Sequence, residues 1–114
     1  MNKICTDLEQ SKKLVELGID VKTADMFWDM AEPEKRRKPL VGPISDYYDM
    51  ENWAVPAWSL SALMNLLDDK AGLAKDYGLW FCYDNGKSHC TKHYDEPIDA
   101  AYKMIIHLHE LKML

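Results

Sequence analysis

Two of the chain's three cysteines and two of its four histidines fall within the segment 79–94, LWFCYDNGKSHCTKHY. Thiolate and imidazole are the preferred ligands of zinc, and a thiol beside an imidazole can also serve nucleophilic catalysis. Asn85 and Gly86 separate two aromatic-rich runs, and this dipeptide is the strongest short-range signal for a β-hairpin with a type I′ turn. The pairing of the two predicted strands, 79–83 and 88–94, decides whether the four side chains can meet.

A two-residue turn at Asn85-Gly86 fixes one register. Cys82 then pairs with His89, and Phe81 pairs with Cys90. Alternation along each strand places Cys82, His89 and His93 on one face. The opposite, buried face receives Leu79, Phe81, Tyr83, Cys90 and Tyr94. His89 and His93 are separated by roughly 13 Å along a strand, too far to bind one zinc ion, so the four ligands do not converge.

A three-residue turn with Gly86 as a bulge gives a second register. It brings Cys82 and Cys90 to one face and sends both histidines to the other, so no four-ligand site forms here either. We prefer the two-residue turn because it gathers the aromatic side chains on one buried face. We expect no metal centre and no catalytic residues, with Cys82 and His89 as the weak metal candidates. A metal-dependent or thiol-based enzyme using Cys82, His89 and His93 is the alternative, and it requires a concave pocket at this face.

Composition bounds the class of protein. The 114 residues are 47% hydrophobic, which suits a single domain spanning 1–114. Three cysteines without a C-x-x-C pair predict a reducing compartment, and no signal-peptide core or membrane-length apolar stretch occurs, so we expect a cytoplasmic protein that does not bind membranes. A net charge of −5 disfavours nucleic acid as a general partner.

The first half of the chain contains a helix, a strand and a loop by pattern. Thr6 and Glu9 fit a T-x-x-E capping box that begins a helix over 7–17, and Gly18 fits its end. Alternation over Ala24–Met30 predicts a strand whose wet face carries Asp25, Phe27 and Asp29. The stretch 32–43, EPEKRRKPLVGP, contains three prolines and predicts an exposed loop.

The second half is richer in helix. Residues 44–55 fit either a short strand or an ordered loop, whereas Pro56 is placed to begin a helix over 57–68. The last helix begins at Asp95-Glu96-Pro97 and runs to the chain end. These elements predict a small α+β domain in which the antiparallel hairpin packs against two or three helices, with 24–30 as a candidate third strand.

The last helix has an unusually wide apolar face. A narrow polar face carries Asp99, Lys103, His107 and Glu110, and His109 falls among the apolar residues. The apolar residues cover more than half of the circumference: Ile98, Ala101, Tyr102, Met104, Ile105, Ile106, Leu108, Leu111 and Met113. Such a helix is either central in the domain or shared with a second copy. We favour the central position, with homodimerisation through Ile105, Ile106 and His109 as the alternative.

A dense basic run, Lys35, Arg36, Arg37 and Lys38, interrupts the acidic chain. Such a run can contact phosphates or an acidic partner, although a solvated loop is the simpler interpretation. Trp53 is a second candidate for a binding surface, because aromatic side chains are enriched at interfaces. The five glycines form neither a P-loop nor a dinucleotide-binding motif, so we expect no cofactor.

Three segments resemble parts of small uncharacterised proteins encoded by bacterial prophages and conjugative elements. They are CTDLEQSKKLVELGIDVKTADM (5–26), PAWSLSALMNLL (56–67) and DEPIDAAYKMIIHLHELKML (95–114). The resemblance implies a cytoplasmic accessory protein of a mobile genetic element and assigns no activity or site. Together with the residues above, it favours a non-enzymatic protein-interaction module, with a small enzyme or a phosphate-binding adaptor as the alternatives.

Overall fold

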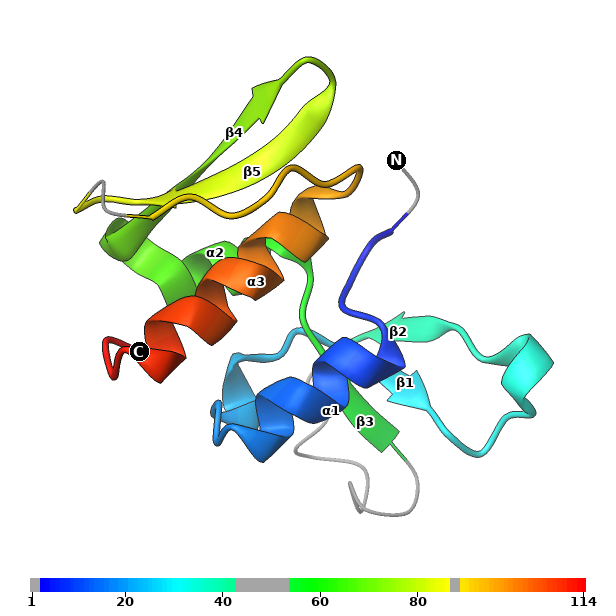
Figure 1. Ribbon diagram of the computed structural model, residues 1–114. Helices are drawn as coiled ribbons and strands as arrows, with labels where there is room; N and C mark the ends of the chain where they lie inside the picture. The colour runs from blue at the N-terminus through cyan, green and yellow to red at the C-terminus, as the bar shows by residue number, and fades with distance from the viewer. Residues whose placement is uncertain (1–2, 43–53, 87–88) are drawn as a thin grey trace. The chain divides into compact units, whose positions relative to one another are not determined.

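The computed structural model describes residues 3–42, 54–86 and 89–114 (Figure 1). Over these residues the chain is α+β, as predicted, with three α-helices and two antiparallel sheets of three and two strands. The chain divides into two compact units. The first, Cys5–Ala62, is called the N-terminal unit, and the second, Leu63–Leu114 with Met1–Ile4, is called the C-terminal unit. No helix in the described ranges is long and apolar enough to cross a membrane.

A three-stranded antiparallel sheet organises the N-terminal unit. Its strands are β1 (Met26–Asp29), β2 (Pro39–Val41) and β3 (Ala54–Ala57), and β1 lies between the other two. The strand predicted over 24–30 is therefore confirmed in type. Its proposed place beside the hairpin is wrong, because its partners come from two other segments of the chain.

Both edge strands of this sheet contain a proline. The Gly42 N–H donates to the Asp25 carbonyl at 2.9 Å, so these two residues form a hydrogen-bonded pair of the antiparallel ladder. Because such pairs recur at every second residue, Phe27 and Leu40 form the next one. The nitrogens of Pro39 and Pro56 then point away from β1, where a missing N–H costs no ladder bond. The prediction of a continuous loop over 32–43 is wrong for the β2 residues, because a proline is tolerated in an edge strand.

Helix α1 (Leu8–Glu16) begins one residue later than the T-x-x-E pattern predicts. Asp7 is the N-cap, and it forms a capping box with Gln10, whose N–H lies 2.8 Å from the Asp7 carboxylate. The helix ends as expected at Gly18, which has a φ of 89°. Thr6 is fully buried and bonds to Trp58 instead of capping the helix.

The N-terminal unit has its core between α1 and the sheet. Helix α1 packs on β3, with Leu14 fully buried. On the sheet, Met26 clusters with Cys5 and Ala57. Phe27 is also buried, at 7% exposure, although alternation predicts a wet face for it. That prediction is wrong because Phe27 packs on Ala54 on the other side of the sheet.

Helix α2 (Leu60–Leu67) is confirmed in type but begins later than Pro56 suggests. Pro56 and Ala57 belong to β3, so the expectation that Pro56 starts the helix is wrong. Ser59 lies immediately before α2, and its hydroxyl accepts the Ala62 N–H at 3.2 Å, as an N-cap does. Most of the segment 44–55, left open between strand and loop, lies outside the described residues, and its last two residues begin β3.

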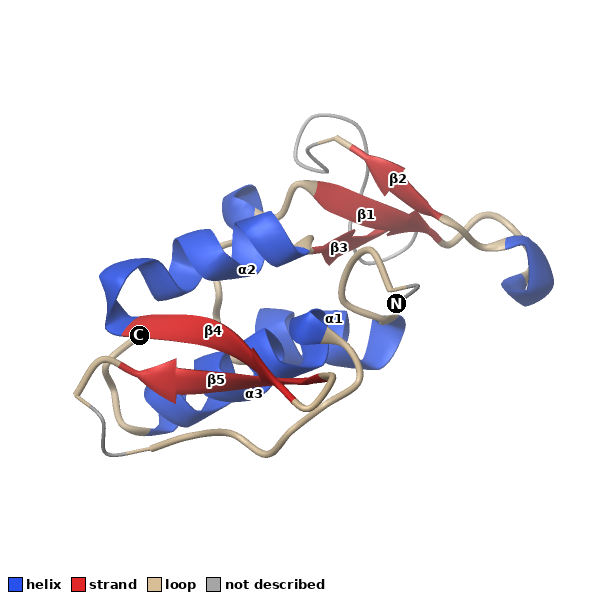
Figure 2. Ribbon diagram, turned by 90° about the horizontal axis from the view of Figure 1, so that it is seen from above, coloured by secondary structure: helices blue, strands red, loops and turns tan. Residues whose placement is uncertain are grey.

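The hairpin of the C-terminal unit lies earlier in the chain than the sequence suggests. It consists of β4 (Ala71–Asp76) and β5 (Leu79–Asp84), which run side by side in Figure 2. Asp76 pairs with Leu79, so Tyr77 and Gly78 are the two turn residues, and their φ angles of 51° and 81° are the positive values that a type I′ turn needs. Tyr77 is 97% exposed at this tip.

The segment 89–94 follows β5 on its other side, but in neither predicted register. Isolated bridges join Tyr83 to Cys90 and Trp80 to Tyr94. The connection at Asn85-Gly86 is therefore longer than two or three residues. The predicted faces are also reversed, because Cys82 is fully buried whereas Cys90 and Tyr83 are exposed.

Helix α3 (Pro97–Glu110) begins where the sequence predicts, with Glu96 as N-cap and a proline in its first turn. It packs against β5 and β4 of its own unit. Ile105, on its apolar face, is fully buried. Leu111 and Met113, beyond the helix end, are about half exposed.

Candidate functional site

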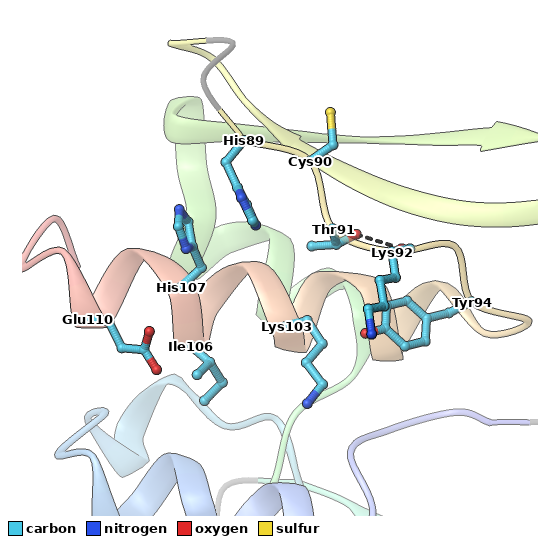
Figure 3. Close-up of a pocket in the computed structure, with 9 residues that line it drawn as sticks. All are labelled: His89, Cys90, Thr91, Lys92, Tyr94, Lys103, Ile106, His107 and Glu110. Atoms are coloured by element: carbon cyan, nitrogen blue, oxygen red, sulfur yellow. Dashed lines mark hydrogen bonds between the residues drawn. The ribbon is translucent and has the colours of Figure 1, made fainter.

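A cavity of about 490 Å³ in the C-terminal unit lies between the segment 89–94 and α3 (Figure 3). His89 from the segment and His107 from the helix line it and point toward one another. Their rings are stacked, with centroids 3.6 Å apart and an interplanar angle of 17°. The structure thus brings together two histidines that are far apart in sequence.

The backbone of β5 holds His89 in this position. The Asp84 N–H donates to the His89 carbonyl at 3.1 Å, and the His89 N–H reaches an Asp84 carboxylate oxygen at 3.3 Å. Two residues on, the Thr91 N–H donates to the Cys82 carbonyl at 2.8 Å, and the Thr91 hydroxyl accepts the Cys82 N–H at 2.9 Å. The segment is therefore attached to β5 at several points, and His89 is directed over α3.

The remaining lining residues give the cavity a mixed character. Lys92 and Lys103 are its cations, and Glu110 is its carboxylate. Tyr94 and Ile106 provide apolar surface. Helix α3 presents its contribution at positions 103, 106, 107 and 110, a spacing that keeps one helical face toward the cavity. Cys90 also lines the cavity, but its sulfur points away from the two imidazoles in Figure 3.

The residues of the enzyme hypothesis are not brought together here. Cys82 is fully buried, and desolvation by this burial raises the pKa of its thiol to about 11. The His93 ring packs against Phe81 with centroids 4.8 Å apart and an interplanar angle of 37°, and its Nε2 lies 3.8 Å from the Asp76 carboxylate. Of the three, only His89 lines the cavity, and the described residues contain no group of three or more metal-ligating side chains.

A second candidate site lies in the N-terminal unit, along the basic run. Lys35, Arg36 and Lys38 line a cavity of about 460 Å³ together with Leu40 and two acidic residues, Asp29 and Glu32. Arg37 points differently, since its Nε donates to the Glu32 carbonyl at 3.0 Å. The short 3-10 helix Glu34–Arg36 carries the first cations, and β2 follows directly after Lys38.

β2 is also the open edge of its sheet. Its side chains at Leu40 and Val41 are 42% and 84% exposed, among the most exposed large apolar residues of the structure. Val41 and Pro39 lie on either side of the hydrogen-bonded position Leu40, so their backbone groups do not bond to β1. The groups that point away from β1 are therefore the Val41 N–H and C=O and the Pro39 C=O. Among the described residues, no strand pairs with this edge, so one donor and two acceptors face away from the sheet next to a basic run.

The other sequence candidates have different surroundings. Ile105 is buried, and Ile106 and His109 are partly exposed on α3. Trp53 lies outside the described residues.

His107, Leu40 and Val41 were not singled out by sequence reasoning: His107 counts only as a polar-face residue of the last helix, and no local signal connects it to His89. Likewise, no local signal shows that β2 is an edge strand, because this depends on its pairing with β1, a strand from another part of the chain.

Comparisons with protein-family models, curated proteins and solved structures found no match.

Proposed function

We propose that this protein is a non-enzymatic interaction module that binds an acidic, extended segment of a partner protein by adding it as a strand to the outer edge of β2. The observation that carries the proposal is the exposed Leu40–Val41 pair on a strand edge that no other described strand covers. Strand addition satisfies the outward backbone groups. The alternate apolar side chains on one face of the added strand contact Val41, because Leu40 and Val41 lie on opposite faces of the sheet.

The basic run argues for an acidic partner. Lys35, Arg36 and Lys38 lie immediately before β2 and on the same cavity as Leu40. A strand beside β2 whose neighbouring residues are acidic would neutralise these cations and associate faster.

The resemblance to proteins of prophages and conjugative elements supports a wider proposal. The partner is then another protein of the same mobile element, and both act in the cytoplasm of the bacterial host. To test this wider proposal, such an element is expressed together with a tagged form of this chain. If no protein of the element co-purifies with the tagged chain, the proposal is contradicted.

The strand-addition proposal is tested with a short peptide that alternates valine with glutamate, and with a control peptide that alternates valine with lysine. We expect saturable binding of the first only, weakened by salt, with the Val41 amide protected from hydrogen exchange in the complex. Equal binding of both peptides, or no protection of Val41, would contradict the proposal.

A matched pair of variants isolates the edge. Val41→Pro removes one outward N–H and no ladder bond, so the fold persists and peptide affinity falls by about tenfold or more. Val41→Thr keeps the N–H and the branched side chain, and affinity stays within about threefold. Two variants with the same affinity would show that the peptide does not pair with β2.

A further inference from the structure

The cavity beside α3 concentrates cations in a chain of net charge −5. Lys92 and Lys103 line it with two histidines against a single carboxylate, Glu110. Within the described part of the chain, neither lysine has a carboxylate within 4.0 Å. The Lys103 Nζ lies 5.8 Å from the centroid of the Tyr102 ring.

The charges are distributed along the cavity. Lys103 and Glu110 are seven residues apart on α3, roughly 10 Å along the helix axis. In Figure 3, Lys92, Tyr94 and Lys103 lie at one end and Glu110 at the other. Ile106 lies between the two ends on the same helix. A ligand that fits this order has an anion at one end and an organic part across Ile106.

We infer that this cavity binds a small phosphate monoester, with the phosphate between Lys92 and Lys103 and the organic part over Ile106 toward the histidine pair. Lysine binds phosphate as a point charge, and two lysines match the roughly double negative charge of a phosphate monoester better than the single charge of a carboxylate. The imidazole N–H groups of His89 and His107 supply further donors. A volume of about 490 Å³ suits such a ligand.

A metal ion fits this cavity less well. Stacked imidazoles with an interplanar angle of 17° aim their nitrogens in nearly parallel directions and not at one point. The described residues also supply no third ligand beside them. Zinc binding needs three or four converging donors, so the histidine pair favours an organic ligand.

The probe is phenyl phosphate, compared with inorganic phosphate and benzoate, titrated into the full chain and followed by backbone amide shifts. We expect saturable binding of phenyl phosphate that shifts the amides of Lys92, Lys103 and Ile106. Inorganic phosphate should bind more weakly because it makes no contact with Ile106, and benzoate more weakly because it lacks the phosphate. No saturable response to phenyl phosphate would overturn the inference, and equal affinity for phosphate or benzoate would overturn the assignment of the ligand class.

Lysine variants distinguish a specific site from general attraction. Lys103→Met, at an exposed position, should weaken phenyl phosphate binding by about tenfold. Lys75→Met removes the same charge from β4, at a residue that does not line the cavity, and should change affinity less than about twofold. An equal loss in both variants would overturn the inference, because it would show attraction by net charge alone.

Discussion

Thr6 and Trp58 are joined by two hydrogen bonds across 52 residues of sequence. The Thr6 N–H donates to the Trp58 carbonyl at 2.9 Å, and the Trp58 N–H donates to the Thr6 hydroxyl at 3.1 Å. Both residues are fully buried. This contact fastens the segment before α1 to the residue after β3 and closes the N-terminal unit.

Removing the Thr6 hydroxyl should destabilise the N-terminal unit. Thr6→Val keeps the size of the side chain but leaves the buried Trp58 N–H without its acceptor, at a cost of about 1–3 kcal/mol. Urea unfolding followed by tryptophan fluorescence measures this difference. Thr6→Ser keeps the hydroxyl and loses one methyl group, about 0.8 kcal/mol. A serine variant as unstable as the valine variant would contradict the role given to the hydroxyl.

The true cap of α1 can be distinguished from the predicted one. Asp7→Ala removes the capping carboxylate and should cost about 1 kcal/mol of unfolding free energy. Glu9→Ala changes an exposed residue of the predicted T-x-x-E box and should stay within about 0.5 kcal/mol of the parent. Thermal unfolding by circular dichroism compares the two. The opposite order of stabilities would support Thr6 and Glu9 as the capping pair.

Two glycines test where the hairpin turns. Gly78 has a φ of 81°, a left-handed conformation in which a Cβ is strained, so Gly78→Ala should destabilise the protein by about 1–2 kcal/mol. Gly86 has open space around its Cα, and Gly86→Ala should be neutral within about 0.5 kcal/mol. Midpoints of thermal unfolding report both effects. A larger loss at Gly86 would favour a turn at Asn85-Gly86.

The three cysteines should differ sharply in reactivity. Cys90 is exposed, whereas Cys5 and Cys82 are buried. With a pKa of about 11, only about 0.1% of the Cys82 thiol is ionised at pH 8, even before access is considered. A disulfide reagent should therefore modify one thiol rapidly in the folded protein and all three in guanidinium. Cys90→Ser should abolish the rapid phase, and its persistence would show that a second thiol is accessible.

Local chemistry accounts for the elements that sequence predicted well. Pro97 in the first turn of α3 and Gly18 after the end of α1 mark these helix ends, because starts and stops depend on residues within one turn of the helix. The alternation of 24–30 predicts a strand where β1 lies, although Phe27 is buried against that pattern. The cap of α1 was misplaced by one residue because Thr6 and Asp7 are both good N-caps, and the buried contact of Thr6 with Trp58 decides between them.

Pairing between distant segments accounts for what sequence could not predict. Asn85-Gly86 is the stronger turn signal, yet Tyr77-Gly78 makes the tight turn, because β4 covers one edge of β5 and leaves the segment 89–94 to the other. That register buries Cys82 and exposes Cys90. The same long-range pairing places His89 on His107, a contact that no local pattern contains.

The sequence by itself determined the α+β class, the positions of α1 and α3, and the residue types available for binding. Only the tertiary structure decided which of them meet. Helix caps and periodicities act over a few residues, whereas strand register is set by which edges are already paired, and a shift of one residue exchanges the two faces of a strand. The cysteines and histidines of 79–94 are therefore separated by their own sheet, and the open β2 edge and the His89–His107 cavity exist because of pairings made elsewhere in the chain.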